Sequence, residues 1–150
     1  PRGPITMIRT TIERWHEALR GESAFEDLLH EDCVFWSPVL FRPMEGRDLT
    51  ALYLRAAYQV FPGDGADATN STDGPSGFRY TKRVLDGNHA VLEFETTMDG
   101  VSVNGVDIIT CDDDGLITEF KVMIRPRKAV EKVQAQMAAM LEQMPPATGV

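Results

Sequence analysis

Cysteine is scarce in this chain: only Cys33 and Cys111 among its 150 residues carry a thiol. Two thiols so far apart in sequence exclude a disulfide framework and a cysteine-based metal cluster. Both lie in strand-like segments, where a buried reduced thiol acts as a small apolar side chain. A single disulfide between them stays open, but this usage fits a reducing compartment. We therefore expect a cytoplasmic protein, with neither a metal nor a cofactor.

Long apolar runs and an excess of positive charge are also missing. No run approaches the roughly 18 residues that a membrane helix needs. The formal net charge is -8 and no basic stripe offsets it, which opposes binding to phosphate groups. We therefore expect neither a membrane nor nucleic acid as a partner. The composition, 43% hydrophobic and 25% charged, is ordinary for a soluble globular protein.

The apolar spacing predicts one α+β domain over residues 1–150, with 1–6 and 145–150 as flexible tails. Ile8, Ile12, Trp15 and Leu19 form one helical stripe that ends at Gly21. The remaining patterns predict a short helix over 24–29, a strand over 32–36, a helix over 49–61, β segments over 78–85, 89–98, 105–112 and 116–124, and a last helix over 127–144. This order predicts helices packed on a curved antiparallel sheet.

One carboxylate, Asp107, interrupts the apolar segment Gly-Val-Asp-Ile-Ile-Thr. Strand alternation places it on one face with Gly105, Ile109 and Cys111, and neither face of this segment is polar. An acid that meets an apolar surface has a raised pKa. We consider two roles for it: a proton or hydrogen-bond donor inside a pocket, or a strand-edge acid bound to the backbone or to Arg125.

Three segments resemble the SnoaL-like branch of the nuclear transport factor 2 superfamily. They are the Trp-His-Glu-Ala-Leu helix, the Glu-Asp-Cys-Val-Phe-Trp-Ser-Pro strand before a Gly-Arg-Asp-Leu helix, and the closing strand pair from 105 to 126. The resemblance covers the chain from Met7 to about Leu141. It implies a cone-shaped sheet with an apolar interior cavity, and a homodimer that pairs its sheets. That fold carries isomerases, cyclases, dehydratases, epoxide hydrolases and binding proteins, so it does not fix a function.

The catalytic sets of known members match poorly. Ketosteroid isomerase resembles this chain at Asp107, the position of its protonated oxyanion-hole aspartate, but its base falls on Ser37 and its tyrosine donor on Trp15. The Asp-Arg-Asp set of limonene epoxide hydrolase falls on about Thr97, Glu95 and Val122. The aspartate acid of SnoaL-type cyclases also falls near Val122. A serine without an adjacent base does not abstract a carbon-bound proton at neutral pH.

These observations predict a protein that binds a small, largely apolar molecule in an interior pocket. It would catalyse an acid-assisted isomerisation, dehydration or cyclisation, with Asp107 as the donor and Tyr53 as an auxiliary. Two alternatives remain: a non-catalytic binding or accessory module, and a dimeric interaction protein without a ligand. The expected ligand-binding residues are apolar or amphipathic side chains on inward stripes or faces: Trp15, Trp36, Ile109, Phe120, Val122 and Ile124.

Overall fold

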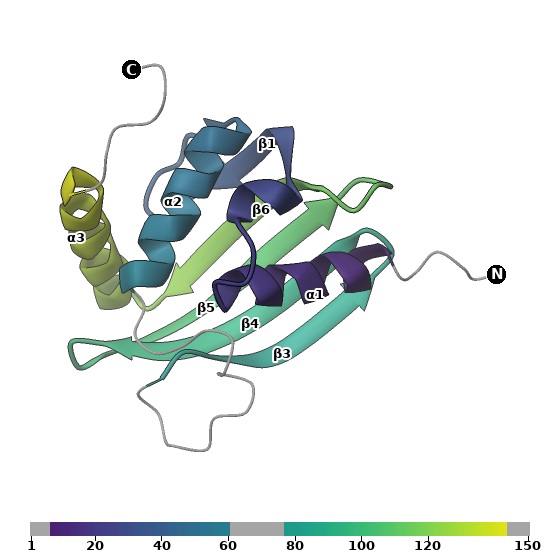
Figure 1. The fold of residues 1–150 in the computed structure, drawn as a ribbon. Coiled ribbons are helices and arrows are strands. Elements are labelled where there is room, and N and C mark those ends of the chain that lie inside the picture. Colours follow the sequence, from purple (N-terminus) through teal and green to yellow (C-terminus); the bar gives the residue numbers. More distant parts are fainter. Residues whose placement is uncertain (1–6, 61–76, 144–150) are drawn as a thin grey trace.

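The computed structural model describes residues 7–60 and 77–143, in which helices cover one face of a curved, open sheet (Figure 1). The helical elements are α1 (Met7–Leu19), the 3-10 helix η2 (Phe25–Leu28), α2 (Arg47–Val60) and α3 (Arg127–Gln143). The strands are β1 (Leu29–Trp36), β2 (Met44–Glu45), β3 (Arg79–Asp86), β4 (His89–Met98), β5 (Val101–Cys111) and β6 (Ile117–Arg125). The α+β fold class is confirmed.

The six strands form one mixed sheet in the order β2-β1-β6-β5-β4-β3. The run from β3 to β6 is an antiparallel meander, as the sequence predicts. The pair of β1 and β6 is parallel instead. The parallel pair arises because β1 precedes α2 and joins the sheet beside the last strand, a long-range pairing that local patterns do not report.

Helix α1 packs on the inner face of the sheet through the predicted stripe. Its buried residues include Ile8, Ile12 and Trp15. The helix ends in a Schellman arrangement, in which the Glu22 N–H donates to the Glu17 carbonyl at 2.9 Å and the Gly21 N–H donates to the Ala18 carbonyl at 3.0 Å. Gly21 has a φ of 80°, a left-handed conformation that glycine adopts without a Cβ penalty.

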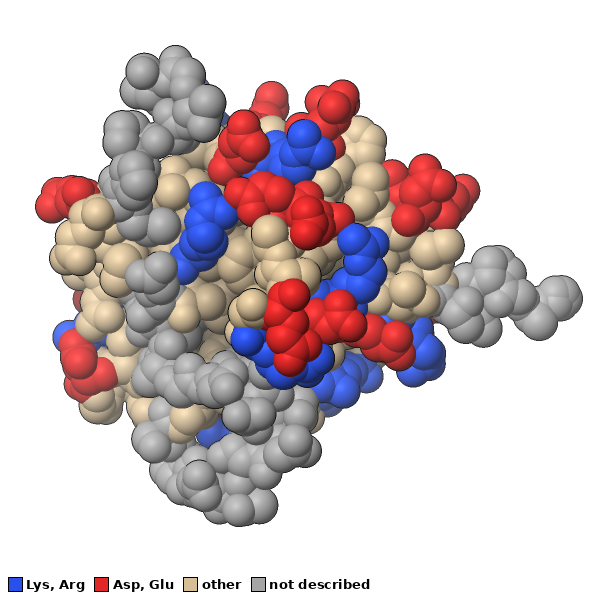
Figure 2. Space-filling model, viewed as in Figure 1, with Lys and Arg blue, Asp and Glu red and all other residues tan. Residues whose placement is uncertain are grey.

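Strict alternation in β4 and β5 divides the sheet into an inner, buried face and an outer face. The outer face carries two half-exposed apolar side chains, Val84 and Met123. This is the face that the predicted homodimer would pair, and that pairing stays a prediction. Over the helices, Figure 2 shows acidic and basic side chains interspersed.

Some predicted boundaries are wrong. Strand β5 begins at Val101, four residues before the predicted start at Gly105. The short helix predicted over 24–29 is a single 3-10 turn, Phe25–Leu28, with Ala24 at its N-cap position. On α2, Leu54 is fully buried whereas Tyr53 is only partly buried. The face of α2 that contacts the core is therefore rotated by about one residue from an orientation that would point Tyr53 inward.

Both cysteines are buried free thiols, which agrees with their expected role as small apolar side chains. In residues 7–60 and 77–143, no helix is both long and apolar enough to cross a membrane. The predicted single domain over 1–150 includes tails that lie outside the described residues.

The core predicts a sharp contrast between two phenylalanines. Phe120 is 1% exposed whereas Phe41 is 95% exposed. Phe120→Ala should lower the free energy of unfolding by about 3–5 kcal/mol, because it removes a buried ring and leaves a cavity. Phe41→Ala is the matched control and should change it by less than about 0.5 kcal/mol. Urea denaturation measures both, and equal losses would contradict this core.

Candidate functional site

Asp107 lies at the middle of the inner face of β5, and its side chain is 1% exposed. It pairs across the sheet with Leu92 of β4 and Val122 of β6. The alternation that predicted its burial with Ile109 and Cys111 is confirmed. Burial of a carboxylate is costly unless the group is paired or neutral, so its partners decide its state.

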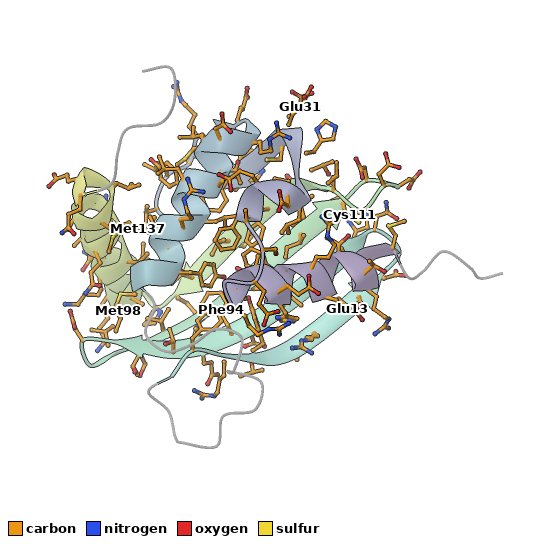
Figure 3. The ribbon with its side chains drawn as sticks, in the orientation of Figure 1. Glu13, Glu31, Phe94, Met98, Cys111 and Met137 are labelled. Atoms are coloured by element: carbon orange, nitrogen blue, oxygen red, sulfur yellow. The ribbon has the colours of Figure 1, made fainter. Side chains whose placement is uncertain are left out.

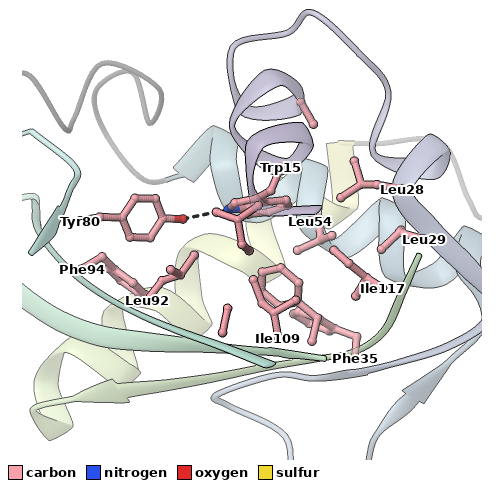
Figure 4. Packing of buried hydrophobic residues seen from close by; sticks show 14 of the residues in the cluster. Trp15, Leu28, Leu29, Phe35, Leu54, Tyr80, Leu92, Phe94, Ile109 and Ile117 are labelled. Atoms are coloured by element: carbon pink, nitrogen blue, oxygen red, sulfur yellow. Dashed lines mark hydrogen bonds between the residues drawn. The ribbon is translucent and has the colours of Figure 1, made fainter. Parts of the chain in front are cut away.

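Two tyrosine hydroxyls from different elements donate to the same oxygen of this carboxyl group. Tyr80 of β3 donates to Asp107 Oδ2 at 3.2 Å, and Tyr58 of α2 donates to the same atom at 3.4 Å. Behind them, Trp15 Nε1 of α1 donates to the Tyr80 hydroxyl at 3.1 Å (Figure 4). Asp107 Oδ1 is buried and has no hydrogen-bond partner among the described groups.

Burial raises the pKa of Asp107 from 3.8 to about 7, against the opposing effect of the Tyr80 and Tyr58 hydrogen bonds. Burial also raises the pKa of both tyrosines well above 10.0, and the neighbouring Asp107 carboxylate adds to this shift. Both tyrosines are therefore neutral donors near pH 7. The carboxyl group exchanges its proton near neutrality, which is the range in which a general acid works best.

The hydrogen-bond pattern assigns a different task to each carboxyl oxygen. Oδ2 accepts from two hydroxyls, so the proton of the neutral acid belongs on Oδ1. A protonated carboxyl group is a hydrogen-bond donor, whereas its anion is an acceptor only. Neutral Asp107 can therefore donate from Oδ1 to an oxygen of a bound molecule, or transfer the proton to it.

A small cavity of about 30 Å³ lies against Asp107. Its lining is mostly apolar and comes from β1 and the following loop, α2, the sheet and α3: Phe35, Ser37, Pro38, Val39, Leu54, Ala57, Tyr58, Phe94, Asp107, Phe120, Val122, Ile124, Val133 and Met137. This volume holds about two water molecules. It is far below the roughly 300 Å³ of common ligand pockets, so side chains largely fill the expected hollow.

Three of the predicted ligand-binding residues, Phe120, Val122 and Ile124, line this cavity. Their shared face on β6 follows from alternation, as the sequence indicated. Trp15 and Ile109 are fully buried in the core, but they are not part of the described lining. Trp15 instead supports the site from behind through Tyr80.

The other two predicted residues, Trp36 and Tyr53, are not in the described lining. Trp36 is on the outer face of the sheet, where its Nε1 donates to Glu119 Oε2 at 2.8 Å and the Lys121 ammonium lies 4.9 Å from its ring centroid. The predicted auxiliary, Tyr53, packs its ring 6.1 Å from that of Phe35. The α2 tyrosine whose hydroxyl donates to Asp107 is Tyr58, not Tyr53.

Tyr80, which donates a hydrogen bond to Asp107, is the residue of the candidate site that sequence reasoning missed. Alternation from the buried Phe78 places Tyr80 on the inner face, so the inward position was detectable. That its hydroxyl meets Asp107 was not, because β3 and β5 are separated by β4. The Trp15, Tyr80 and Phe94 side chains lie close together in Figure 4.

Other polar groups near the cavity are few. Ser37 is the remaining hydroxyl in the described lining. His16 packs its ring 5.7 Å from that of Tyr80, and burial, Arg83 and Arg20 lower its pKa to about 4. The His16 side chain is partly buried. Within the described segments, no three His, Cys, Asp or Glu side chains form a metal site.

Comparison with known proteins settles the family. Residues 12–120 match the model of the SnoaL-like domain. The chain belongs to the SnoaL-like family. No protein with a curated description matches this chain in sequence. The family agrees with the resemblance drawn from the closing strand pair and the first helix.

Several solved structures are similar to this SnoaL-like chain. A steroid delta-isomerase from Pseudomonas aeruginosa shares 28% identity over 91% of this chain and 93% of its own, with a TM-score of 0.78. An uncharacterized protein with a cystatin-like fold from Silicibacter pomeroyi shares 33% identity over 86% and 83%, with a TM-score of 0.71. An LEH-like epoxide hydrolase from M. tuberculosis shares the fold, at 20% identity over 92% and 96% and a TM-score of 0.52.

The raised pKa of Asp107 predicts how stability depends on pH. The folded state keeps the Asp107 proton up to about pH 7, whereas the unfolded state loses it near 3.8. Between these values the unfolded state binds fewer protons, so wild-type stability falls as pH rises. Asp107→Asn keeps a neutral group. The stability of this variant relative to wild type should rise by about 1.4 kcal/mol per pH unit from about pH 4 to 7, or about 4 kcal/mol in all.

Denaturant unfolding of both proteins at several pH values measures this difference. The lowered pKa of His16 contributes to both proteins and largely cancels in the comparison. A difference between the two proteins that stays constant from pH 4 to 8 would contradict the raised pKa.

Proposed function

We propose that this SnoaL-like protein binds a small, largely apolar molecule in its interior pocket and holds one oxygen of that molecule with neutral Asp107. The observation that carries the proposal is the asymmetry of the carboxyl group. Oδ2 receives two hydroxyl donors, whereas Oδ1 is buried without a partner in the described structure and belongs to a cavity-lining residue. A ligand oxygen would satisfy Oδ1 at low cost, because the acid is already neutral.

The reaction class that this site supports is acid-assisted isomerisation, dehydration or cyclisation. In each, negative charge develops on an oxygen that was a carbonyl or a leaving hydroxyl. A donor already aimed at that oxygen in a dry site stabilises this charge strongly. Tyr58 and Tyr80 hold the acid in position and share its charge once it ionises. The identity shared with a protein named steroid delta-isomerase supports a carbonyl compound as the ligand class.

A second candidate function is binding without catalysis. The polar residues in the described lining are Ser37, Tyr58 and Asp107. Neither Ser37 nor Tyr58 is a base at neutral pH. Any carbon-bound proton would have to leave to water. This composition favours a binding or accessory module, in which Asp107 only anchors the polar end of its ligand.

The third candidate function is an interaction protein without a ligand, and the small cavity volume of about 30 Å³ supports it. The hydrogen bonds of Asp107 argue against an interaction protein without a ligand. A structural acid would be satisfied at both oxygens, by backbone or by arginine, whereas this one is held by tyrosines on one side only. We therefore favour a ligand that enters by displacing the half-buried Met137 and Val39 at the cavity wall.

Binding of cyclohex-2-enone, a small apolar ketone, tests the proposal. Wild-type affinity should be constant below about pH 7 and should fall about tenfold per pH unit above it, because only the neutral acid donates. Asp107→Asn should bind with no such pH dependence, since its amide accepts from the tyrosines and donates to the ketone. Asp107→Leu should bind weakly at every pH. Calorimetric titration from pH 5 to 9 measures all three.

Tyr53→Phe is the matched control, because Tyr53 packs on Phe35 outside the cavity lining, and it should match wild type. Wild-type affinity that is unaffected by pH, or equal in Asp107→Leu, would contradict the proposal. To separate the two candidates, conversion of cyclohex-3-enone to cyclohex-2-enone is followed by absorbance. Turnover in wild type that is lost in Asp107→Asn indicates an enzyme, and binding without turnover indicates a binding module.

A further inference from the structure

Next to Asp107 on the inner face of β5 is a position without a side chain, Gly105. It pairs with Phe94 of β4 and Ile124 of β6. A methyl group added at Gly105 would lie 2.8 Å from the Met123 carbonyl oxygen and 2.9 Å from Phe94 Cε2. Both distances are too short for carbon, so the ring of Phe94 lies across the glycine and occupies the space beside the carboxyl group.

The ring of Phe94 is a fixed wall. It is 1% exposed, it stacks on Phe78 at 4.9 Å with an interplanar angle of 25°, and it meets the edge of Tyr80 at 6.4 Å and 90°. The Tyr80 hydroxyl donates a hydrogen bond to Asp107. Close packing in such an aromatic cluster resists displacement of any one ring. The Phe94 ring and the Asp107 carboxyl group are therefore held in a fixed arrangement relative to each other.

A second wall is equally fixed. Phe120 is 1% exposed and packs 4.9 Å from Trp15 and 6.1 Å from Phe35. The adaptable part of the lining is Met137 of α3, labelled in Figure 3, with Val39 of the loop after β1, and both are only partly buried. An unbranched methionine re-packs readily around different shapes. The cavity can therefore widen toward α3 but not past Phe94 or Phe120.

The cavity volume limits the size of the ligand. The cavity measures about 30 Å³, whereas a buried site for one benzene ring needs about 150 Å³. Displacement of one methionine and one loop side chain is a change of about that size. A fused four-ring molecule needs several times more and would have to pass one of the fixed rings.

We infer that Phe94, lying over Gly105, sets the upper size limit of the ligand, so that the site takes a one-ring or short branched carbonyl or hydroxyl compound and excludes fused-ring steroids. This inference rests on the proposed function, and it gives the ligand class for that same Asp107 site. It also separates this chain from the steroid delta-isomerase to which it is similar.

The test compares two ketones that carry the same conjugated group: cyclohex-2-enone, with one ring, and androst-4-ene-3,17-dione, with four. Each is titrated at pH 6 into the full chain while NMR follows the carboxyl carbon of Asp107. The variants are Phe94→Ala and the milder Phe94→Leu, which retains most of the buried volume. Met98→Ala is the control, because Met98 is on the same face of β4 and 2% exposed but is not in the described lining and pairs with Val101, not with Asp107.

Wild type should respond to cyclohex-2-enone and not to androstenedione at its solubility limit. Phe94→Ala and Phe94→Leu should bind androstenedione at least about tenfold more tightly than wild type, and Met98→Ala should behave as wild type does. If wild type binds both ketones equally well, or if neither folded Phe94 variant gains affinity, the size limit is wrong while the proposed function stands. If neither ketone moves the Asp107 signal in any protein, the proposed function itself fails.

Discussion

The burial of one carboxyl group among aromatic rings is the constraint on which the rest of this site depends. An ionised carboxylate in such surroundings costs several kcal/mol unless charges or donors compensate it. Here the protein supplies two hydroxyls and no cation, which leaves the pKa near 7. These donors come from α2 and β3, and the indole that supports them comes from α1. Three elements that are distant in sequence therefore meet at this single group.

The residues around this acid differ from the catalytic set that the resemblance to ketosteroid isomerase implies, although the fold is shared. The positions that match the base and the tyrosine of ketosteroid isomerase hold Ser37 and Trp15. Trp15 does not point a donor at the cavity but at Tyr80, and Tyr80 in turn holds Asp107. The acid is retained with a new set of supports, and no base accompanies it in the described lining. A shared fold thus carries an altered site.

Sequence patterns predicted the fold class and the burial of Asp107 because both depend on local periodicity. Phe120, Val122 and Ile124 were placed at the cavity for the same reason. The hydrogen-bond partners were not predictable in this way, since they depend on the rotation of α2 and on which strands become neighbours. A rotation of α2 by about one residue decides whether Tyr53 or Tyr58 points toward Asp107.

Gly105 shows a further limit of sequence reasoning. The predicted β segment begins at Gly105, yet this residue lies inside the observed strand. A glycine within a strand often marks the close approach of another group, and here that group is the Phe94 ring. Phe94 is opposite Gly105 across the β4–β5 pair, so the short turn between these strands sets their register, but the tilt of the ring over the glycine depends on packing against Phe78 and Tyr80.

The most direct test of this account is a titration of the Asp107 carboxyl carbon by NMR in the ligand-free protein. The Asp107 carboxyl group should lose its proton near pH 7, because burial raises its pKa from 3.8 to about 7. A midpoint at or below about 3.9, the value for aspartate in water, would show a carboxylate that is charged at neutral pH. The acid could then donate nothing to a ligand.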